Sequence, residues 1–494
     1  MLGFDMETRR INDIITAGAN TKLTDKAFLE KEIRKFLGSR ARRMMIKGDM
    51  YYDYEQAIKN KARMVIGEDG TLTEDKNLPN NKFCDNDYAI MVDQKVNYIF
   101  SKPITFKTED GKYEKALKDV FNKGFMRTLK NLAKDSYNGG IAWLYPYYDE
   151  NGAFKIKRFH PWEVLPFWKD EDHTELDFAV RVYNVLAYEG ELEKELTFVE
   201  VYDTQGIHRF EYQNSQLVPD YSTNYFEHIN EDGSVVAYNW NRVPLISFKS
   251  NENETPLIKK CKGLQDGINQ LLSEYGDGLQ ENASGNSILV IHNYGGTNLG
   301  EFRRNLMTYK AVKVNSVDGS SGGIDTLQIE VNSENYKVIL SELHKAIIKN
   351  CKGYDIEELK SSGSPNEMTI KSVFSMIDMD ANEIETEFQA SFEQLLWFVN
   401  SHFANAGIGN FAESDIDVIF NRDMMINESQ IIVDCQNSAG LISQRTIVAN
   451  HPWTSNVDEE LKQIEDERNE AAAMDEINMF GSNTEDGADN SEDE

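Results

Sequence analysis

The chain has 494 residues, and its 83 Asp and Glu outnumber 52 Lys and Arg to give a formal net charge of −31. This charge argues against high-affinity DNA binding by the bulk surface, because such binding needs Lys and Arg to neutralise phosphates. With 40% hydrophobic and 11% aromatic residues, most of the chain is expected to fold, into roughly three domains. Apolar runs are too short for a membrane-spanning helix and no signal peptide is evident, so we expect a soluble intracellular protein.

Motifs of enzyme and metal chemistry are missing from the sequence. The four cysteines form no CxxC pair and have no histidine at ligand spacing, and GxxxxGK[ST], HExxH and GxSxG do not occur. Residues 378–382 resemble the start of a calcium loop, but Glu383 and Gln389 stand where that loop needs glycine and a bidentate glutamate. The sequence therefore predicts no enzyme activity, no metal site and no cofactor.

The first half of the chain predicts helices followed by strands. One helix ends at Gly38, and residues 88–100 repeat apolar side chains at helical spacing. From Ile141 apolar and polar residues alternate, and the turn DENG at 149–152 predicts a hairpin. Further short strands continue to about Phe248, so the first half predicts an α+β body with a meandering sheet.

The second half predicts long amphipathic helices. Two helices, at 253–283 and 332–350, flank a strand-containing segment at 284–331, and a polar loop follows at 351–364. Apolar residues recur every third or fourth position, at Leu257, Cys261, Leu264, Ile268, Leu271, Tyr275 and Leu279 in the first helix and at Tyr336, Leu340, Leu343 and Ile347 in the second. The next helix, of about 40 residues or roughly 60 Å, needs a packing surface along its length, which we take to include neighbouring subunits.

The C-terminal end is strongly acidic. Residues 458–494 hold 15 acidic and 2 basic residues, a net charge of −13 that leaves −18 on the preceding 457 residues. Such a composition predicts a solvated, disordered tail.

Several stretches resemble the portal proteins of tailed bacteriophages, in the group common among phages of low-GC Gram-positive hosts. The stretches are NLPNNKFCDNDYAIMVDQKVNYIFSKPITFK at 77–107, NRVPLISFKSN at 241–251, SPNEMTIKSVFSMIDMDANEIE at 364–385, FNRDMMINESQII at 420–432 and GLISQRTIVANHPW at 440–453. Each is weak alone, but their order and spacing over about residues 30–470 are specific.

The resemblance implies a ring, usually of twelve subunits, at the capsid vertex where the genome enters and leaves. It implies an α+β subunit with an N-terminal helical arm at 1–39, a sheet-containing wing at 40–252, stem helices at 253–283 and 332–350, a small β clip at 284–331, a tunnel loop at 351–364, a long kinked helix with wing return at 365–422, a helical crown at 423–470 and the acidic tail at 471–494. An alternative is another ring or scaffold protein of a mobile genetic element that has no DNA channel.

The resemblance also implies partners and a location. The expected partners are further copies of the chain as a dodecamer, double-stranded DNA without sequence specificity, the terminase large subunit, a head-completion or tail adaptor protein, and the scaffolding and major capsid proteins. No membrane is involved. The expected location is the virion, with the host cytoplasm during assembly.

Candidate site residues fall into three groups. The tunnel loop supplies DNA contacts, and its net charge of −1 suits brief phosphate contacts, although an exposed linker is the alternative. One face of the second stem helix would line the channel, with ordinary solvent exposure as the alternative, and the apolar stripes would form the oligomer interface. In this order the groups are Lys352, Asp355, Glu357, Glu358 and Lys360; Lys337, Ser341 and Lys345; and Leu340, Leu343 and Phe388.

Overall fold

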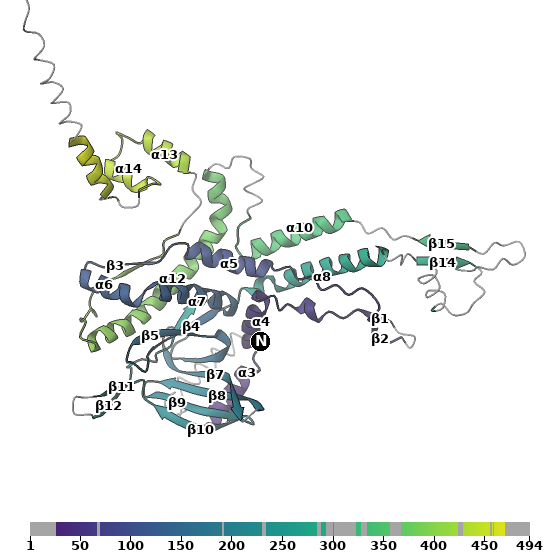
Figure 1. Ribbon diagram of the computed structural model, residues 1–494, viewed down its shortest axis with the longest axis horizontal. Helices are drawn as coiled ribbons and strands as arrows, with labels where there is room; N and C mark the ends of the chain where they lie inside the picture. Colours follow the sequence, from purple (N-terminus) through teal and green to yellow (C-terminus); the bar gives the residue numbers. More distant parts are fainter. Residues whose placement is uncertain are drawn as a thin grey trace, which may run out of the picture. The chain divides into compact units, whose positions relative to one another are not determined.

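The computed structural model describes residues 26–66, 70–189, 192–229, 234–283, 288–292, 300, 323–327, 333–355, 367–422, 428–454, 457 and 459–469. The chain divides into two compact units, the first made of Met1–Asp355 with Phe374–Asp423 and the second of Ile356–Val373 with Met424–Glu494. Helices and sheets are segregated within the first unit (Figure 1), so the α+β class is confirmed. No helix of the described residues is long and apolar enough to span a bilayer.

A five-stranded antiparallel sheet forms one layer of the first unit. Its strands follow chain order as a meander: β6 (Val164–Trp168), β7 (Leu176–Glu189), β8 (Leu192–Asp203), β9 (Gly206–Gln213) and β10 (Gln216–Thr223). Helix α3 (Lys26–Leu37) covers one face, where Leu29 and Ile33 pack against alternate strand residues such as Val180 and Val199. The period of two in the sequence is thus explained, because one face of each strand is buried.

A three-stranded sheet and its helices form the next layer. β4 (Ile141–Tyr148) pairs with β5 (Phe154–Phe159) through the predicted turn at 149–152 and with β13 (Ile246–Lys249) on its other side. Helix α7 (Lys123–Gly139) packs on all three strands and on α4 (Arg40–Tyr52). The remaining elements of this half are η1 (Ala57–Asn60), β1 (Met64–Ile66), β2 (Leu72–Glu74), α5 (Asp87–Ile99), β3 (Thr105–Lys107), α6 (Gly111–Val120), η2 (Pro161–Glu163), β11 (Phe226–Ile229) and β12 (Val235–Tyr238).

Helix α12 (Glu367–Asn405) supplies the aromatic core of the first unit. The ring of Phe248 in β13 lies 5.0 Å from Phe388 and 5.6 Å from Phe392, between ring centroids. The chain then returns as β16 (Asp417–Ile419), which pairs with β3. Phe388 is 0% exposed in the single chain, so the expectation that it lies at a subunit interface is wrong: its ring is already enclosed by its own subunit.

Two long helices pair side by side within the first unit. They are α8 (Ile258–Ala283) and α10 (Ser333–Asn350), and each begins and ends close to a helix expected from the sequence. Their role as a stem stays a prediction. Between them in the chain, β14 (Ile288–His292) and β15 (Gly323–Leu327) form an antiparallel pair. The rest of the predicted clip lies mostly outside the described residues.

The second unit is helical in its described part. Helix α13 (Glu428–Asn437) packs against α14 (Gln444–Asn450), and the Ser443 hydroxyl caps α14 by accepting from the amide of Thr446. Residues 459–469 are also helical. The predicted acidic tail at 471–494 lies outside the described residues.

The aromatic core generates a prediction about Phe388. Replacing this fully buried ring with alanine removes its packing and leaves a cavity, so we expect a loss of roughly 3–5 kcal/mol of stability. Thermal unfolding of Phe388→Ala, compared with Leu340→Ala on the partly exposed face of α10, measures the difference. Equal stability of Phe388→Ala and the parent would contradict the core assignment.

Candidate functional site

The apolar stripe of α10 faces α8, as the sequence predicts. The rings of Tyr336 and Tyr275 lie 4.9 Å apart between centroids, and the Leu343 side chain lies directly over Gly267. Leu340 and Leu343 keep part of their surface exposed in the single chain. Their contribution to a subunit interface therefore stays a prediction.

The three residues predicted to line a channel share the opposite side of α10. Lys337, Ser341 and Lys345 are all exposed, and the Lys345 ammonium lies 3.5 Å from a carboxylate oxygen of Glu342 on the same helix. An exposed pair of this kind contributes little stability. This face of α10 is thus available to a ligand, and its role in a channel remains a prediction.

A row of buried polar side chains runs along a different face of α8. Its members are spaced by four residues and accept backbone N–H groups of residues 81–85, which precede α5, and of Tyr88 in the first turn of α5. The amide of Asn81 donates to Asp277 (2.6 Å), Phe83 to Ser273 (3.0 Å), Asp85 to Asn269 (2.8 Å) and Tyr88 to Gln265 (3.1 Å). All four side chains are at most 1% exposed. This polar row was missed from the sequence, where polar residues at helical spacing look like a solvent-facing side.

Asp277 ends the polar row with two ion pairs. Its carboxylate lies 2.7 Å from the Lys61 ammonium and 3.6 Å from the Arg63 guanidinium. Burial by itself would raise the pKa of Asp277, but the hydrogen bonds from Asn81 and Lys61 outweigh burial and hold this pKa below its ordinary value. The segment that contains β1 and β2 is therefore held to the same helix.

The close approach of this segment to α8 requires a glycine. A Cβ atom at Gly276 would lie 2.4 Å from Cε2 of Phe83. Only glycine therefore lets the Phe83 ring sit against the helix. Gly276 is followed directly by Asp277, so the close approach of Phe83 and the hydrogen bond from Asn81 lie at the same turn of α8.

A buried ion pair joins three elements at the base of the two helices. The Lys95 ammonium in α5 is 0% exposed, lies 2.7 Å from the Asp380 carboxylate in α12, and donates to the carbonyl of Lys352 after α10. The Tyr137 hydroxyl in α7 donates to the same carboxylate at 2.8 Å. Burial lowers the pKa of Lys95, and the charge of Asp380 offsets part of that effect. Loss of either charge would leave the other buried and unpaired.

The first residues of the predicted tunnel loop are attached to this base. Lys352 has a left-handed backbone (φ 53°) and its ammonium lies 2.8 Å from Glu383 of α12, which raises the pKa of Lys352. The backbone of Tyr354 exchanges two hydrogen bonds with the Gln94 side chain, and its ring packs on Phe374. Asp355 follows directly and is partly exposed. The other loop residues, Glu357, Glu358 and Lys360, lie outside the described residues.

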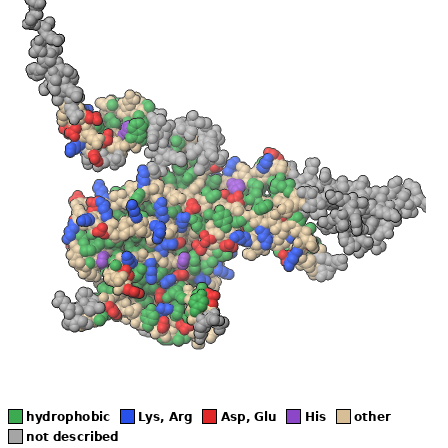
Figure 2. All heavy atoms as spheres, viewed as in Figure 1, with side chains coloured by type: hydrophobic (Ala, Val, Ile, Leu, Met, Phe, Trp, Pro, Cys, Tyr) green, Lys and Arg blue, Asp and Glu red, His purple; other side chains and the backbone are tan. Residues whose placement is uncertain are grey.

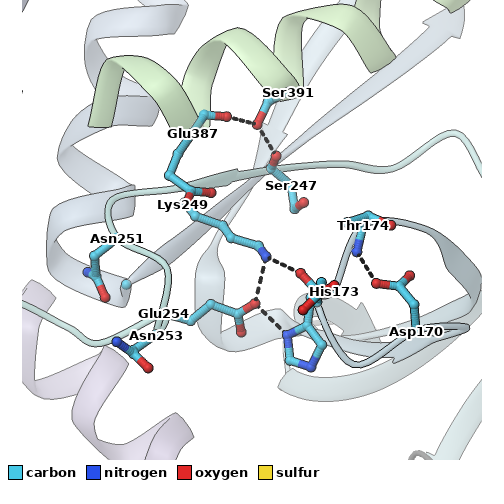
Figure 3. A network of polar contacts seen from close by, with 12 residues as sticks. Asp170, His173, Thr174, Ser247, Lys249, Asn251, Asn253, Glu254, Glu387 and Ser391 are labelled. Atoms are coloured by element: carbon cyan, nitrogen blue, oxygen red, sulfur yellow. Dashed lines mark hydrogen bonds and ion pairs between the residues drawn. The ribbon is translucent and has the colours of Figure 1, made fainter. Parts of the chain in front are cut away.

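A second network, drawn in Figure 3, holds the loop that leads into α8. His173 Nδ1 lies 2.6 Å from a carboxylate oxygen of Glu254, and the Lys249 ammonium lies 3.4 Å from the same oxygen. His173 and Glu254 both have positive φ values, 56° and 50°. Such conformations persist in non-glycine residues only where the surroundings enforce them. The turn between β6 and β7 is thereby tied to the start of α8.

Helix α12 and Gly140 complete this attachment. The Ser391 hydroxyl of α12 donates to the carbonyl of Ser247 at 2.6 Å. Gly140 has a φ of 83°, and a Cβ there would lie 2.1 Å from the carbonyl oxygen of Glu254. The loop before α8 can approach α7 only because this position lacks a side chain.

A metal site would need several His, Cys, Asp or Glu side chains close together. Among the residues that the structure describes, no group of three or more His, Cys, Asp or Glu side chains could hold a metal ion. The acids of the calcium-like stretch have other contacts, since Asp378 accepts from the Tyr98 hydroxyl and Asp380 pairs with Lys95.

Comparison with known proteins identifies the family. Residues 39–474 match the family model described as "Phage portal protein, SPP1 Gp6-like". The chain belongs to this family of portal proteins. The portal protein of Bacillus phage SPP1 is 26% identical over 473 residues, covering 94% of this chain and 91% of that protein.

A second portal protein, from Clostridium phage phiCD119, is 26% identical over 468 residues and covers 92% of this chain and 99% of that protein. The chain therefore functions as a bacteriophage portal protein. Portal proteins are structural ring proteins of the virion. A solved chain in the "Neck of native GTA particle computed with C12 symmetry" matches 74% of this chain and 89% of its own length at 13% identity, with a TM-score of 0.37 that is too low to support further conclusions.

The polar row of this portal subunit generates a prediction about Asp277. Replacing its carboxylate with an amide leaves Lys61 without its buried counter-charge, so Asp277→Asn should destabilise this contact by roughly 2–3 kcal/mol. Amide hydrogen exchange in residues 78–88 should then accelerate by more than about tenfold. Because the pKa of Asp277 is lowered in the folded chain, the difference from the parent should be fully present at neutral pH and should shrink as the pH falls below about 4.

Glu274→Gln is the matched control, because Glu274 lies on the same helix but is exposed. It should leave the exchange of residues 78–88 unchanged. Equal effects of the two variants would mean that Asp277 does not hold the segment.

Proposed function

We propose that twelve copies of this chain form a ring that conducts double-stranded DNA during packaging and ejection. In this proposal the α8–α10 pair surrounds the channel as the stem, and the β14–β15 end forms the clip. The clip would receive the terminase large subunit and later a head-completion or tail adaptor protein. Scaffolding and major capsid proteins would contact the wing, and assembly would take place in the host cytoplasm.

The observation that carries the proposal is the firm attachment of two long paired helices within a member of the portal family. Each end of the described part of α8 has its own support: the His173–Glu254 pair holds the loop before it, and Asp277 lies near its far end. A subunit that transmits force from a motor to a capsid needs such rigid elements. The chain offers no nucleotide-binding loop, so the energy for translocation would come from the separate ATPase partner.

The charge of the chain supports a channel that DNA slides through. A net charge of −31 repels phosphates, and strong binding through many Lys and Arg contacts would oppose translocation. Lys337 and Lys345, exposed on α10, would supply a few weak contacts that steady the duplex. Lys352 and Asp355 would begin the loop that contacts DNA, and Glu357, Glu358 and Lys360 would supply its further charged groups.

Electron microscopy of the purified protein viewed end-on tests the ring directly. We expect a closed ring with a central hole. A monomer that stays stable at micromolar concentration would contradict the proposal.

The exposed face of α10 generates a prediction about its two lysines. Lys337→Glu with Lys345→Glu should leave the ring intact and reduce the salt dependence of its DNA binding, because fewer counterions are released. Packaged DNA should fall several-fold. Lys259→Glu with Lys260→Glu on α8 makes the same charge change on other exposed residues and should not alter packaging, so equal effects would rule out a special role of α10.

The predicted tunnel loop at 351–364 generates a prediction in which positive charge is added and not removed. Glu357→Lys with Glu358→Lys converts a weakly acidic loop into a basic one, so each ring should hold DNA and packaged DNA should fall by about tenfold. The double change of Glu459 and Glu460 to Lys, in the second unit, matches the charge difference and should package normally. Normal packaging by the loop variant would refute the assignment.

A further inference from the structure

A groove on the first unit has no role in the function proposed above. It encloses about 830 Å³ between α6, the start of α7, the β4–β5 turn and the end of α12. This volume lies within the range of ordinary ligand sites. Its apolar lining is made by Ala116, Val120, Phe125, Phe154, Ile156, Phe403 and Ile408.

Three lysines surround this apolar lining. Lys112 and Lys115 come from α6 and Lys155 from β5, and all three side chains are exposed. Their ammonium groups form no ion pair with any residue that the structure describes, whereas the neighbouring Lys118 pairs with Glu114 at 2.6 Å. One acid, Asp119, also lines the groove. The cations are therefore available to a negatively charged ligand.

The single histidine of the groove adds no positive charge. His402 Nδ1 lies 3.0 Å from the Tyr148 hydroxyl, and its ring stacks on Phe154 at 4.7 Å between centroids. Burial lowers the pKa of His402, so its ring is neutral at physiological pH. It belongs to the aromatic floor.

The surroundings of the groove are basic in an acidic protein. Residues 102–134 hold nine Lys and Arg against four Asp and Glu, in a chain with a net charge of −31. Lys and Arg side chains gather on the face of the first unit that carries α6 and α7 (Figure 2). Long-range attraction would therefore bring an anionic partner toward this face.

We propose that the groove binds an acidic peptide segment with interspersed apolar side chains, presented by a partner protein. The lysine rim would pair with the carboxylates while the aromatic floor buries the apolar side chains, a division between polar rim and apolar core that is typical of protein interfaces. Duplex DNA would use the lysines but gain nothing from an apolar hollow. The combination of rim and floor therefore favours a peptide over a nucleic acid.

Fluorescence anisotropy with the full-length protein tests this proposal. The probe is a short labelled peptide in which Asp and Glu alternate with Leu and Phe, and the comparison ligands are an all-Glu peptide of the same length and a short DNA duplex. The rim variant changes Lys112, Lys115 and Lys155 to Glu, and the floor variant is Ile408→Asp, at a position that is already 36% exposed. The control variant changes the exposed Lys76, Lys259 and Lys260 to Glu.

We expect the alternating peptide to bind the parent and the control variant equally, and to bind the rim and floor variants at least tenfold more weakly. Circular dichroism melting of each variant establishes that it is folded. Three results would overturn the proposal: no binding of the alternating peptide, equally tight binding of the all-Glu peptide, or equal weakening by the control variant. Tighter binding of the duplex than of the peptide, lost in the rim variant, would identify a site for nucleic acid instead.

Discussion

Hydrogen bonds between the backbone of residues 81–85 and the polar row of α8 determine how the long helices are supported. Four residues of helix advance about 6 Å along its axis and two residues of an extended chain advance about 6.6 Å. Every second amide of residues 81–85 therefore meets every fourth side chain of α8, from Asp277 to Asn269. Each bond satisfies an acceptor side chain of α8 that is at most 1% exposed, and a buried acceptor without a partner would cost about 1–3 kcal/mol.

Two linkages at the base of the helices join neighbouring elements. Lys95 links α5, α12 and the end of α10, and the His173–Glu254 pair links a sheet turn to the start of α8. Each linkage contains a feature that costs free energy on folding. In the first it is the fully buried ammonium of Lys95, and in the second it is the left-handed backbone of His173 and Glu254. Such features fix one arrangement of neighbouring elements. The loop that begins at Lys352 leaves from this base, so its origin is rigidly defined.

Charge is distributed unevenly over the chain, and the two proposals use opposite parts of it. The acidic majority suits a surface that releases DNA, whereas the basic face around α6 and α7 suits an anionic partner. The two surfaces differ also in their apolar content. The exposed face of α10 presents Lys337, Ser341 and Lys345, while the groove places its lysines around phenylalanine rings. Under the two proposals, this distribution would separate the passage of DNA from the binding of a partner protein.

Periodicity and composition by themselves determined the class and the order of the elements, and the resemblance of five stretches to portal proteins indicated the family. The alternation from Ile141, the turn at 149–152 and the helical stripes of α8 and α10 all depend on local geometry, which is why they were predictable from sequence. The tertiary structure decided which partner each face meets. An apolar stripe on a helix has the same sequence pattern whether residues of its own chain or of a neighbouring subunit cover it. For this reason Phe388 was assigned to an interface, although its own subunit encloses it. A row of polar residues on a helix is typical of a solvent-facing side unless a distant segment brings backbone donors to it. Only the structure shows that residues 81–88 supply such donors to Gln265, Asn269, Ser273 and Asp277. Both cases have one physical cause: burial is a property of contacts between distant parts of the chain, which local sequence does not contain.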